Sequence, residues 1–286
     1  MDSRDFQLRD ISLRADEAGP KDGIPILFLH GGGQTRHAWG RAVKAVAERG
    51  YRGMSFDLRG HGDSGWSDDG RYSIERYADD FEQVCAQLTA RPVLVGASLG
   101  GLTGMRLLEQ APLSLSALVL VDIVPRVPDD GAEHVRTFMQ AGQDGFASIE
   151  EAAEAVSRYL PHRKRPRDSG GLNKNLRRRA DGRYYWHWDP NMMNRFEGVP
   201  RDILAERFFR TLADTDIPVM LIRGGLSQIV TEEGMREFQQ KVPHAEVAEV
   251  GDADHMVAGD SNRLFNHAVL DFLERNKDRI AAVQTA

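Results

Sequence analysis

Short runs of apolar residues alternate along the chain with longer stretches in which apolar residues recur every three or four positions. Such runs are typical of buried strands, and the longer periodic stretches are typical of amphipathic helices. The predicted strands cover residues 7–14, 24–29, 52–56, 92–95, 118–121, 219–222 and 246–250. The predicted helices cover residues 38–49, 74–88, 101–109, 231–241 and 263–277. Strands that are apolar throughout indicate a sheet covered on both faces, so the pattern predicts an α/β fold with a doubly wound, mostly parallel sheet.

The alternation breaks after Asp122 and resumes near Ile217. We therefore predict a core made of residues 1–123 and 208–286, with residues 124–207 inserted as a cap after the sixth strand. Within the cap, Asp181-Gly182 lies between two stretches with the composition of extended chain, which predicts a β-hairpin.

Composition narrows the classes of protein that the chain can belong to. The 286 residues are 41% hydrophobic and 28% charged, and the net charge of −6 gives no reason to expect a nucleic-acid or membrane partner. The single cysteine, Cys85, excludes an intrachain disulfide. The first residues are charged and no apolar run approaches the ~20 residues of a membrane helix, so we expect a cytoplasmic protein.

The sequence around Ser98 predicts a nucleophile. Gly96-Ala97-Ser98-Leu99-Gly100 follows a predicted strand and precedes a predicted helix. A serine at such a strand-to-helix turn is held exposed at the carboxyl end of the sheet, and small residues two positions away let the backbones approach closely. The alternative is a glycine-rich loop with an ordinary surface serine.

Glycines directly after the strand at residues 24–29 predict an oxyanion hole. In His30-Gly31-Gly32-Gly33 the backbone N–H groups can point into a site without obstruction by side chains. The expected donors are the N–H groups of Leu99, next after Ser98, and of Gly32 and Gly33. The segment lacks the glycine spacing of nucleotide-binding loops, so a phosphate site is not expected.

Taken together, these segments resemble the α/β-hydrolase superfamily, in its esterase, epoxide-hydrolase and cofactor-free haloperoxidase-like branch. The resemblance includes the glycine turn, Asp57-Leu58-Arg59-Gly60-His61-Gly62-Asp63-Ser64, the turn at Ser98 and Asp254-His255-Met256, all in the family's order. It implies an eight-stranded sheet with the cap after the sixth strand. It also implies that a serine nucleophile, rather than an aspartate, acts on esters or related acyl compounds.

The base of a catalytic triad is expected on a loop after the last strand, where His255 lies and where the resemblance also places it. We interpret His30 as a structural partner of the oxyanion turn and His61 as a loop residue. His187, like the remaining histidines, has no motif context.

The acidic member of the expected triad departs from the family pattern. The resemblance places an aspartate after the strand at residues 219–222, but this chain has Gln228 there. Asp122 directly follows the strand at residues 118–121, at the same edge of the sheet as Ser98, so we predict that it replaces the missing acid. The alternative is that Asp122 caps the insertion or anchors Arg59.

Aromatic residues of the predicted hairpin are candidates for substrate binding. Tyr185, Trp186 and Trp188 lie on an extended arm, one face of which can line the mouth of the site. The alternative is that these rings pack the cap onto the core. Basic residues of the cap, at positions 163–167 and 177–179, either favour an anionic substrate or form a solvated surface.

These features predict a serine hydrolase that cleaves a small carboxylic ester or lactone. Ser98 would attack the carbonyl, His255 would transfer the proton and Asp122 would orient His255. We expect a small-molecule substrate and no metal or organic cofactor; the sequence makes no prediction of oligomeric state. The alternatives are a C–C bond hydrolase or cofactor-free perhydrolase that uses the same residues, and a non-catalytic ligand-binding homologue.

Overall fold

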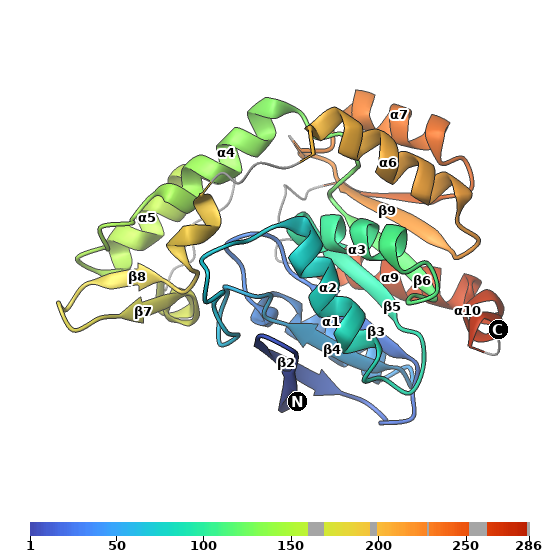
Figure 1. Ribbon diagram of the computed structural model, residues 1–286, viewed down its shortest axis with the longest axis horizontal. Helices are drawn as coiled ribbons and strands as arrows, with labels where there is room; N and C mark the ends of the chain where they lie inside the picture. Colours follow the sequence, from blue (N-terminus) through green and yellow to red (C-terminus); the bar gives the residue numbers. More distant parts are fainter. Residues whose placement is uncertain (160–168, 195–198, 228, 252–261, 285–286) are drawn as a thin grey trace.

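The computed structural model (Figure 1) describes residues 1–159, 169–194, 199–227, 229–251 and 262–284. Its strands are β1 (Asp2–Gln7), β2 (Ser12–Ala18), β3 (Pro25–Leu29), β4 (Arg52–Phe56), β5 (Val93–Ala97), β6 (Ala117–Val121), β7 (Leu176–Arg178), β8 (Tyr184–Trp186), β9 (Val219–Gly224) and β10 (Glu246–Val250). Its α-helices are α1 (Gly40–Ala47), α2 (Ile74–Cys85), α3 (Leu99–Gln110), α4 (Asp129–Gln140), α5 (Ile149–Tyr159), α6 (Arg201–Asp214), α7 (Glu232–Lys241), α9 (Asn262–Arg275) and α10 (Lys277–Val283). The short 3₁₀ helices are η1 (Arg36–Trp39), η2 (Ser169–Asn175) and η3 (Pro190–Met193).

The main sheet has eight strands in the order β1-β2-β4-β3-β5-β6-β9-β10. The pairs β1/β2 and β2/β4 are antiparallel, and every other pair is parallel. The predicted fold class is therefore confirmed. Because β5, β6 and β9 are adjacent and parallel, the residues that follow them lie at one edge of the sheet.

The N-terminal part of the sheet differs from the prediction. A single strand over residues 7–14 was expected, but the chain turns there, with the Leu8 N–H donating to the Ile11 carbonyl at 2.8 Å. β1 and β2 form an antiparallel hairpin on either side of this turn. The prediction was wrong because alternating polar and apolar residues give the same signal on both arms of a hairpin.

Helices cover both faces of the sheet, as the apolar strands predicted. One face packs against α2, α3, α6 and α7 through a cluster that includes Phe81, Leu107, Phe208 and Phe238. The other face packs against α1, α9 and α10 through a cluster that includes Val43, Phe265, Phe272 and Ile280. The two clusters form the core that holds the strand ends in place.

The inserted segment forms a lobe with a small core of its own. Figure 1 shows α4, α5, β7 and β8 grouped at the left, away from α9 and α10. Their contacts centre on Phe146, Ala152, Leu176 and Trp186. β7 and β8 pair as an antiparallel hairpin, which confirms the hairpin predicted at Asp181-Gly182. The predicted boundary between residues 207 and 208 falls within α6.

None of the helices that the structure describes is both long enough and apolar enough to cross a membrane.

Candidate active site

Ser98 lies at the tight turn between β5 and α3, as the sequence predicted. Its backbone angles are φ 46° and ψ −110°, a conformation that costs a residue other than glycine on the order of 1–3 kcal/mol. Its N–H donates to the Val121 carbonyl at 3.3 Å, which ties the turn to the end of β6. A Cβ added at Gly100 would lie less than 3.0 Å from the Leu29 carbonyl oxygen, so glycine is required where α3 passes over β3. The strain at Ser98 is therefore maintained by close packing of β3, β5 and α3.

The glycine turn after β3 lies against Ser98. A Cβ added at Gly31 would be 3.3 Å from the Ser98 Cβ. Leu99 is the first residue of α3, so its N–H has no acceptor within the helix. The Gly33 N–H instead donates to the His61 Nε2 at 3.2 Å and is occupied by that bond. Of the two predicted glycine donors, Gly32 is therefore the one whose N–H is available to a substrate.

Asp122 is fully buried at the end of β6, with a positive φ of 51°. Its carboxylate accepts hydrogen bonds from the Gly224 N–H at 3.0 Å and from the Ser227 hydroxyl at 2.7 Å. Both donors belong to the end of β9 and the loop after it, where relatives were expected to carry their acid. The two donors fix the orientation of the carboxylate.

The alternative that Asp122 anchors Arg59 is wrong. The Arg59 guanidinium donates to Asp80 at 2.6 and 2.7 Å, and its Nη2 also lies 3.2 Å from Asp10. Burial of this group is thus compensated by carboxylates from α2 and from the β1–β2 turn. Asp122 has no role in that network.

Two predicted residues, His255 and Gln228, lie outside the described residues. Their roles as base and as the occupant of the usual acid position stay predictions.

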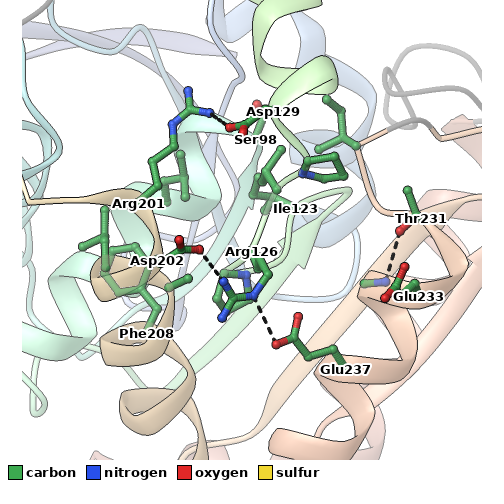
Figure 2. Close-up of a pocket in the computed structure, with 18 of the residues that line it drawn as sticks. Ser98, Ile123, Arg126, Asp129, Arg201, Asp202, Phe208, Thr231, Glu233 and Glu237 are labelled. Carbon is green, nitrogen blue, oxygen red and sulfur yellow. Dashed lines mark hydrogen bonds and ion pairs between the residues drawn. The ribbon is translucent and has the colours of Figure 1, made fainter.

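Ser98 lies between two cavities. The larger, of about 810 Å³, is bounded by the segment after β6 and by α4, α6 and α7 (Figure 2). The smaller, of about 120 Å³, lies beside the glycine turn and is lined mainly by apolar cap side chains that include Val135, Phe138, Leu172 and Trp186. An acyl compound whose carbonyl sits at Ser98 can therefore extend in two directions.

Charged residues surround the larger cavity. Arg126 donates to Asp202 at 2.5 Å and to Glu237 at 3.2 Å (Figure 2), and also to Glu206 at 2.5 Å. These bonds link the segment after β6 to α6 and α7. Among the described residues that line this cavity, four are carboxylates and two are arginines. The acidic members are Asp129, Asp202, Glu233 and Glu237. The wall thus carries an excess of negative charge.

The three aromatic candidates of the cap have different positions. Trp186 lines the smaller cavity, as predicted. Trp188 lies behind it, stacked on Trp186 at a ring distance of 4.8 Å and in contact with Gly33. Tyr185 lines neither cavity: its hydroxyl donates to Asp181 at 2.7 Å and its ring lies under Arg179. The prediction for Tyr185 needs correction because successive strand residues point to opposite faces, and Trp186 occupies the inner face.

The basic residues at positions 177–179 also point elsewhere, and those at positions 163–167 lie outside the described residues. Arg177 pairs with Asp63 at 2.9 Å, and Arg178 lies over the Tyr184 ring. Neither residue lines a cavity beside Ser98. For positions 177–179, the solvated-surface interpretation is therefore the better one.

A row of three buried histidines lies behind the glycine turn. The ring centroids of His30 and His61 are 4.7 Å apart, and those of His61 and His187 are 5.9 Å apart. Burial lowers the pKa of His30 to about 3, and it holds the pKa values of His61 and His187 well below 6.5. All three imidazoles are therefore neutral at pH 7. Sequence reasoning missed His187 because nothing in the local pattern indicates that a residue of the cap reaches this turn.

The fold and the site have the form of a hydrolase: a strained serine lies at a strand-to-helix turn of a doubly wound sheet, beside a glycine turn. A family model described as alpha/beta hydrolase fold matches residues 24–261, and the chain belongs to that family.

Relatives with known names agree with this assignment. Esterase Rv0045c of Mycobacterium tuberculosis is 30% identical over 257 residues, which cover 87% of this chain and 82% of the relative. The non-heme chloroperoxidase CPO-A1 of Kitasatospora aureofaciens is 29% identical over 269 residues, which cover 88% and 93%. The crystal structure of E-2-(acetamidomethylene)succinate hydrolase superposes with a TM-score of 0.81 at 22% identity, covering 95% of this chain and 98% of the other, and so shows the same fold.

Proposed function

We propose that this alpha/beta hydrolase is a serine hydrolase that cleaves a small carboxylic ester or lactone through an acyl-enzyme. The observation that carries the proposal is the strained Ser98, which lies against the glycine turn and opens onto two cavities. A surface serine in an ordinary loop would require none of this strain or close packing. The esterase relative at 30% identity supports the same class of reaction.

In the proposed mechanism, the Ser98 Oγ attacks the substrate carbonyl carbon while His255 takes the hydroxyl proton. The N–H groups of Leu99 and Gly32 bind the resulting oxyanion. Asp122 orients His255 and stabilises its positive charge. Collapse of the tetrahedral intermediate breaks the C–O bond, and the leaving alcohol receives the proton from His255. Water, deprotonated by His255, then attacks the acyl-enzyme and releases the acid and free Ser98.

The test combines turnover with labelling of Ser98. We expect the wild type to hydrolyse a short-chain p-nitrophenyl ester and to react with a fluorophosphonate at Ser98, as shown by mass spectrometry of the labelled peptide. We expect Ser98→Ala to lose at least about 10³-fold in kcat/KM and to remain unlabelled. Ser114→Ala, on the loop before β6, is the matched control and should behave as wild type. Unchanged turnover in Ser98→Ala would exclude the proposal, and failure of the wild type in both assays would favour a ligand-binding homologue.

A second function on the same residues is supported by the chloroperoxidase relative. In a perhydrolase, hydrogen peroxide takes the place of water in attacking the acyl-enzyme and yields a peracid. Peracid formation from acetate and peroxide that exceeds p-nitrophenyl ester hydrolysis would favour this function. Cleavage of a diketone in the absence of ester turnover would favour the C–C hydrolase alternative.

A further inference from the structure

The three buried histidines form hydrogen bonds that determine which ring nitrogen carries the proton. The His61 Nε2 accepts from the Gly33 N–H, so its proton lies on Nδ1, which faces the Arg59 carbonyl at 3.1 Å. The His30 Nε2 accepts from the Leu58 N–H at 3.0 Å, and its Nδ1 donates to the Gly31 carbonyl at 2.7 Å. The His187 Nδ1 accepts from the Gly62 N–H at 2.7 Å. Each ring thus supports a backbone group of the loops beside Ser98.

These bonds hold both peptide groups that flank the Gly32 Cα. The Gly31 carbonyl and the Gly32 N–H belong to one peptide, and in a trans peptide they point in opposite directions. Because His30 holds that carbonyl, it directs the Gly32 N–H away from itself. His61 holds the next peptide through the Gly33 N–H. The direction of the proposed oxyanion donor is therefore set by two imidazoles.

The cap also contacts the two backbone segments that carry His61 and Gly33. His187 accepts from Gly62, next in the chain to His61, and the Trp188 ring lies where a Cβ at Gly33 would be 3.2 Å from it. The Asp189 N–H donates to the Gly60 carbonyl at 2.8 Å, and its carboxylate accepts from the Tyr72 hydroxyl at 2.7 Å. The consecutive cap residues 187–189 thus each contact either the glycine turn at residues 30–33 or the loop at residues 58–63.

The second ring nitrogen of His187 is buried as well. Its Nε2 is buried and makes no hydrogen bond of ordinary geometry with any described residue. The Gly33 backbone partly offsets the lowering of the His187 pKa by burial.

We propose that His187 is a positioning residue through which the seated cap orders the oxyanion turn, by way of Gly62, His61 and Gly33. The proposal rests on the proposed serine-hydrolase function for its effect on rate, but the ordering of the turn does not depend on it. It assigns the cap a part in catalysis besides enclosing substrate. A cap displaced from the loop at residues 58–63 would leave the Gly32 N–H less well directed.

The kinetic test compares two substitutions at one position. His187→Asn places an acceptor oxygen near the position of Nδ1, whereas His187→Leu keeps similar volume without an acceptor. We expect His187→Leu to lower kcat for a p-nitrophenyl ester about 10-fold with KM within 2-fold, because oxyanion donors act mainly in the transition state. His187→Asn should stay within about 3-fold of wild type. The Ki of a trifluoromethyl ketone, which forms an oxyanion on Ser98, should rise in His187→Leu by the factor by which kcat/KM falls.

The control is Phe146→Leu, in the core of the cap, where Phe146 packs on Trp186 without touching the glycine turn. It should leave kcat within 2-fold. An equal loss in Phe146→Leu would show that general loosening of the cap is responsible and would overturn the proposal. An unchanged kcat in His187→Leu would overturn it as well.

Amide exchange and imidazole NMR test the proposal independently of activity. We expect hydrogen exchange at the Gly33 amide to be at least about 10-fold faster in His187→Leu than in wild type. In the wild type, nitrogen shifts should show a proton on Nδ1 of His61 and on Nε2 of His187. Unchanged exchange at Gly33, or the opposite tautomer of His61, would overturn the proposal even if no ester were hydrolysed. Absence of turnover together with the expected exchange and tautomers would count only against the proposed function.

Discussion

At the scale of single residues, Asp122, the proposed acid, lies at the edge of the sheet where the loop after β9 also lies. β6 and β9 are parallel neighbours, so an aspartate after β6 reaches the loop after β9. Its carboxylate is held there by a backbone N–H and by the Ser227 hydroxyl. The same Ser227 oxygen accepts from the N–H groups of Ile229 and Val230 at 3.1 and 3.0 Å, which fixes the direction of its own proton toward Asp122.

The contacts of the Asp122 carboxylate predict that replacing it by an amide will lower both activity and stability. Asp122→Asn removes the negative charge and places an NH₂ group opposite either the Gly224 N–H or the Ser227 hydroxyl. We therefore expect kcat/KM on a p-nitrophenyl ester to fall by about 10³-fold or more. The free energy of unfolding should also fall by about 1–3 kcal/mol, because one buried donor loses its acceptor. Asp130→Asn, on the exposed first turn of α4, is the control and should change neither quantity. Wild-type turnover in a folded Asp122→Asn would show that another group orients His255.

Several of these positions could be predicted from the sequence because they follow from chain order. Ser98, Asp122 and the glycine turn each come directly after an apolar strand, and parallel strands bring such residues to one edge. The bond between Gly33 and His61 spans 28 residues, and that between Gly62 and His187 spans 125. No local pattern carries such a pairing, since it depends on how the cap packs on the core. The choice between Gly32 and Gly33 as donor therefore required the structure.

At the scale of elements, the approach of α3 to the sheet depends on glycine at its first turns. A Cβ at Gly100 would overlap the Leu29 carbonyl, a backbone atom that cannot turn aside. Gly234, in α7, is different: the nearest atom to an added Cβ would be the Thr231 Oγ1 at 3.5 Å. Close packing against β3 thus requires the glycine in α3, whereas packing does not require the glycine in α7.

These two glycines give a matched pair of substitutions. We expect Gly100→Ala to lower the free energy of unfolding by about 1–3 kcal/mol and to reduce ester turnover, because α3 must move away from β3. Gly234→Ala should raise stability by about 0.5–1 kcal/mol, since alanine is the better helix former and the added methyl group makes only ordinary van der Waals contacts. Urea unfolding of both variants measures the difference. Equal stabilities would mean that α3 can shift without cost.

The alternation of side chains along β8 gives a second prediction at this scale. Trp186 lines the smaller cavity and Tyr185 lies on the opposite face. Trp186→Phe should change kcat/KM for p-nitrophenyl esters of different acyl length by several-fold, because the wall of the cavity is reshaped. Tyr185→Phe should stay within about 2-fold for every ester. A larger effect from Tyr185→Phe than from Trp186→Phe would contradict the orientation of the strand.

At the scale of the whole molecule, burial of three neutral histidines links folding to pH. The unfolded chain takes up protons as the pH falls through about 6.5, whereas the folded chain keeps these imidazoles neutral, down to about pH 3 for His30. Each lowered pKa thus contributes stability that is present above pH 6.5 and is lost as the pH falls below it. Protonation would also remove the lone pairs that accept from Gly33, Leu58 and Gly62.

We therefore expect the free energy of unfolding to decrease between pH 6.5 and 5, with a limiting slope of about 4 kcal/mol per pH unit for three histidines. Urea titrations at intervals from pH 7.5 to 5 measure this slope. His61→Gln, which keeps an acceptor for the Gly33 N–H, should lower the slope by about one third. His267→Gln, on the exposed face of α9, should leave it unchanged. Constant stability over this range would show that the three rings take up protons in the folded protein as readily as in the unfolded chain.

The negative wall of the larger cavity has a consequence for how a catalytic cycle ends. In the proposed hydrolysis of an uncharged ester the product is a carboxylate, so the ligand acquires a negative charge only after the chemistry is complete. The product anion then lies beside a wall of four acidic side chains and two arginines, whereas the substrate was neutral (Figure 2). Repulsion at that moment favours departure of the acid and weakens product inhibition, most of all at low ionic strength. The charges around Arg126 would thus promote turnover by expelling the product, without any contact with the reacting bond.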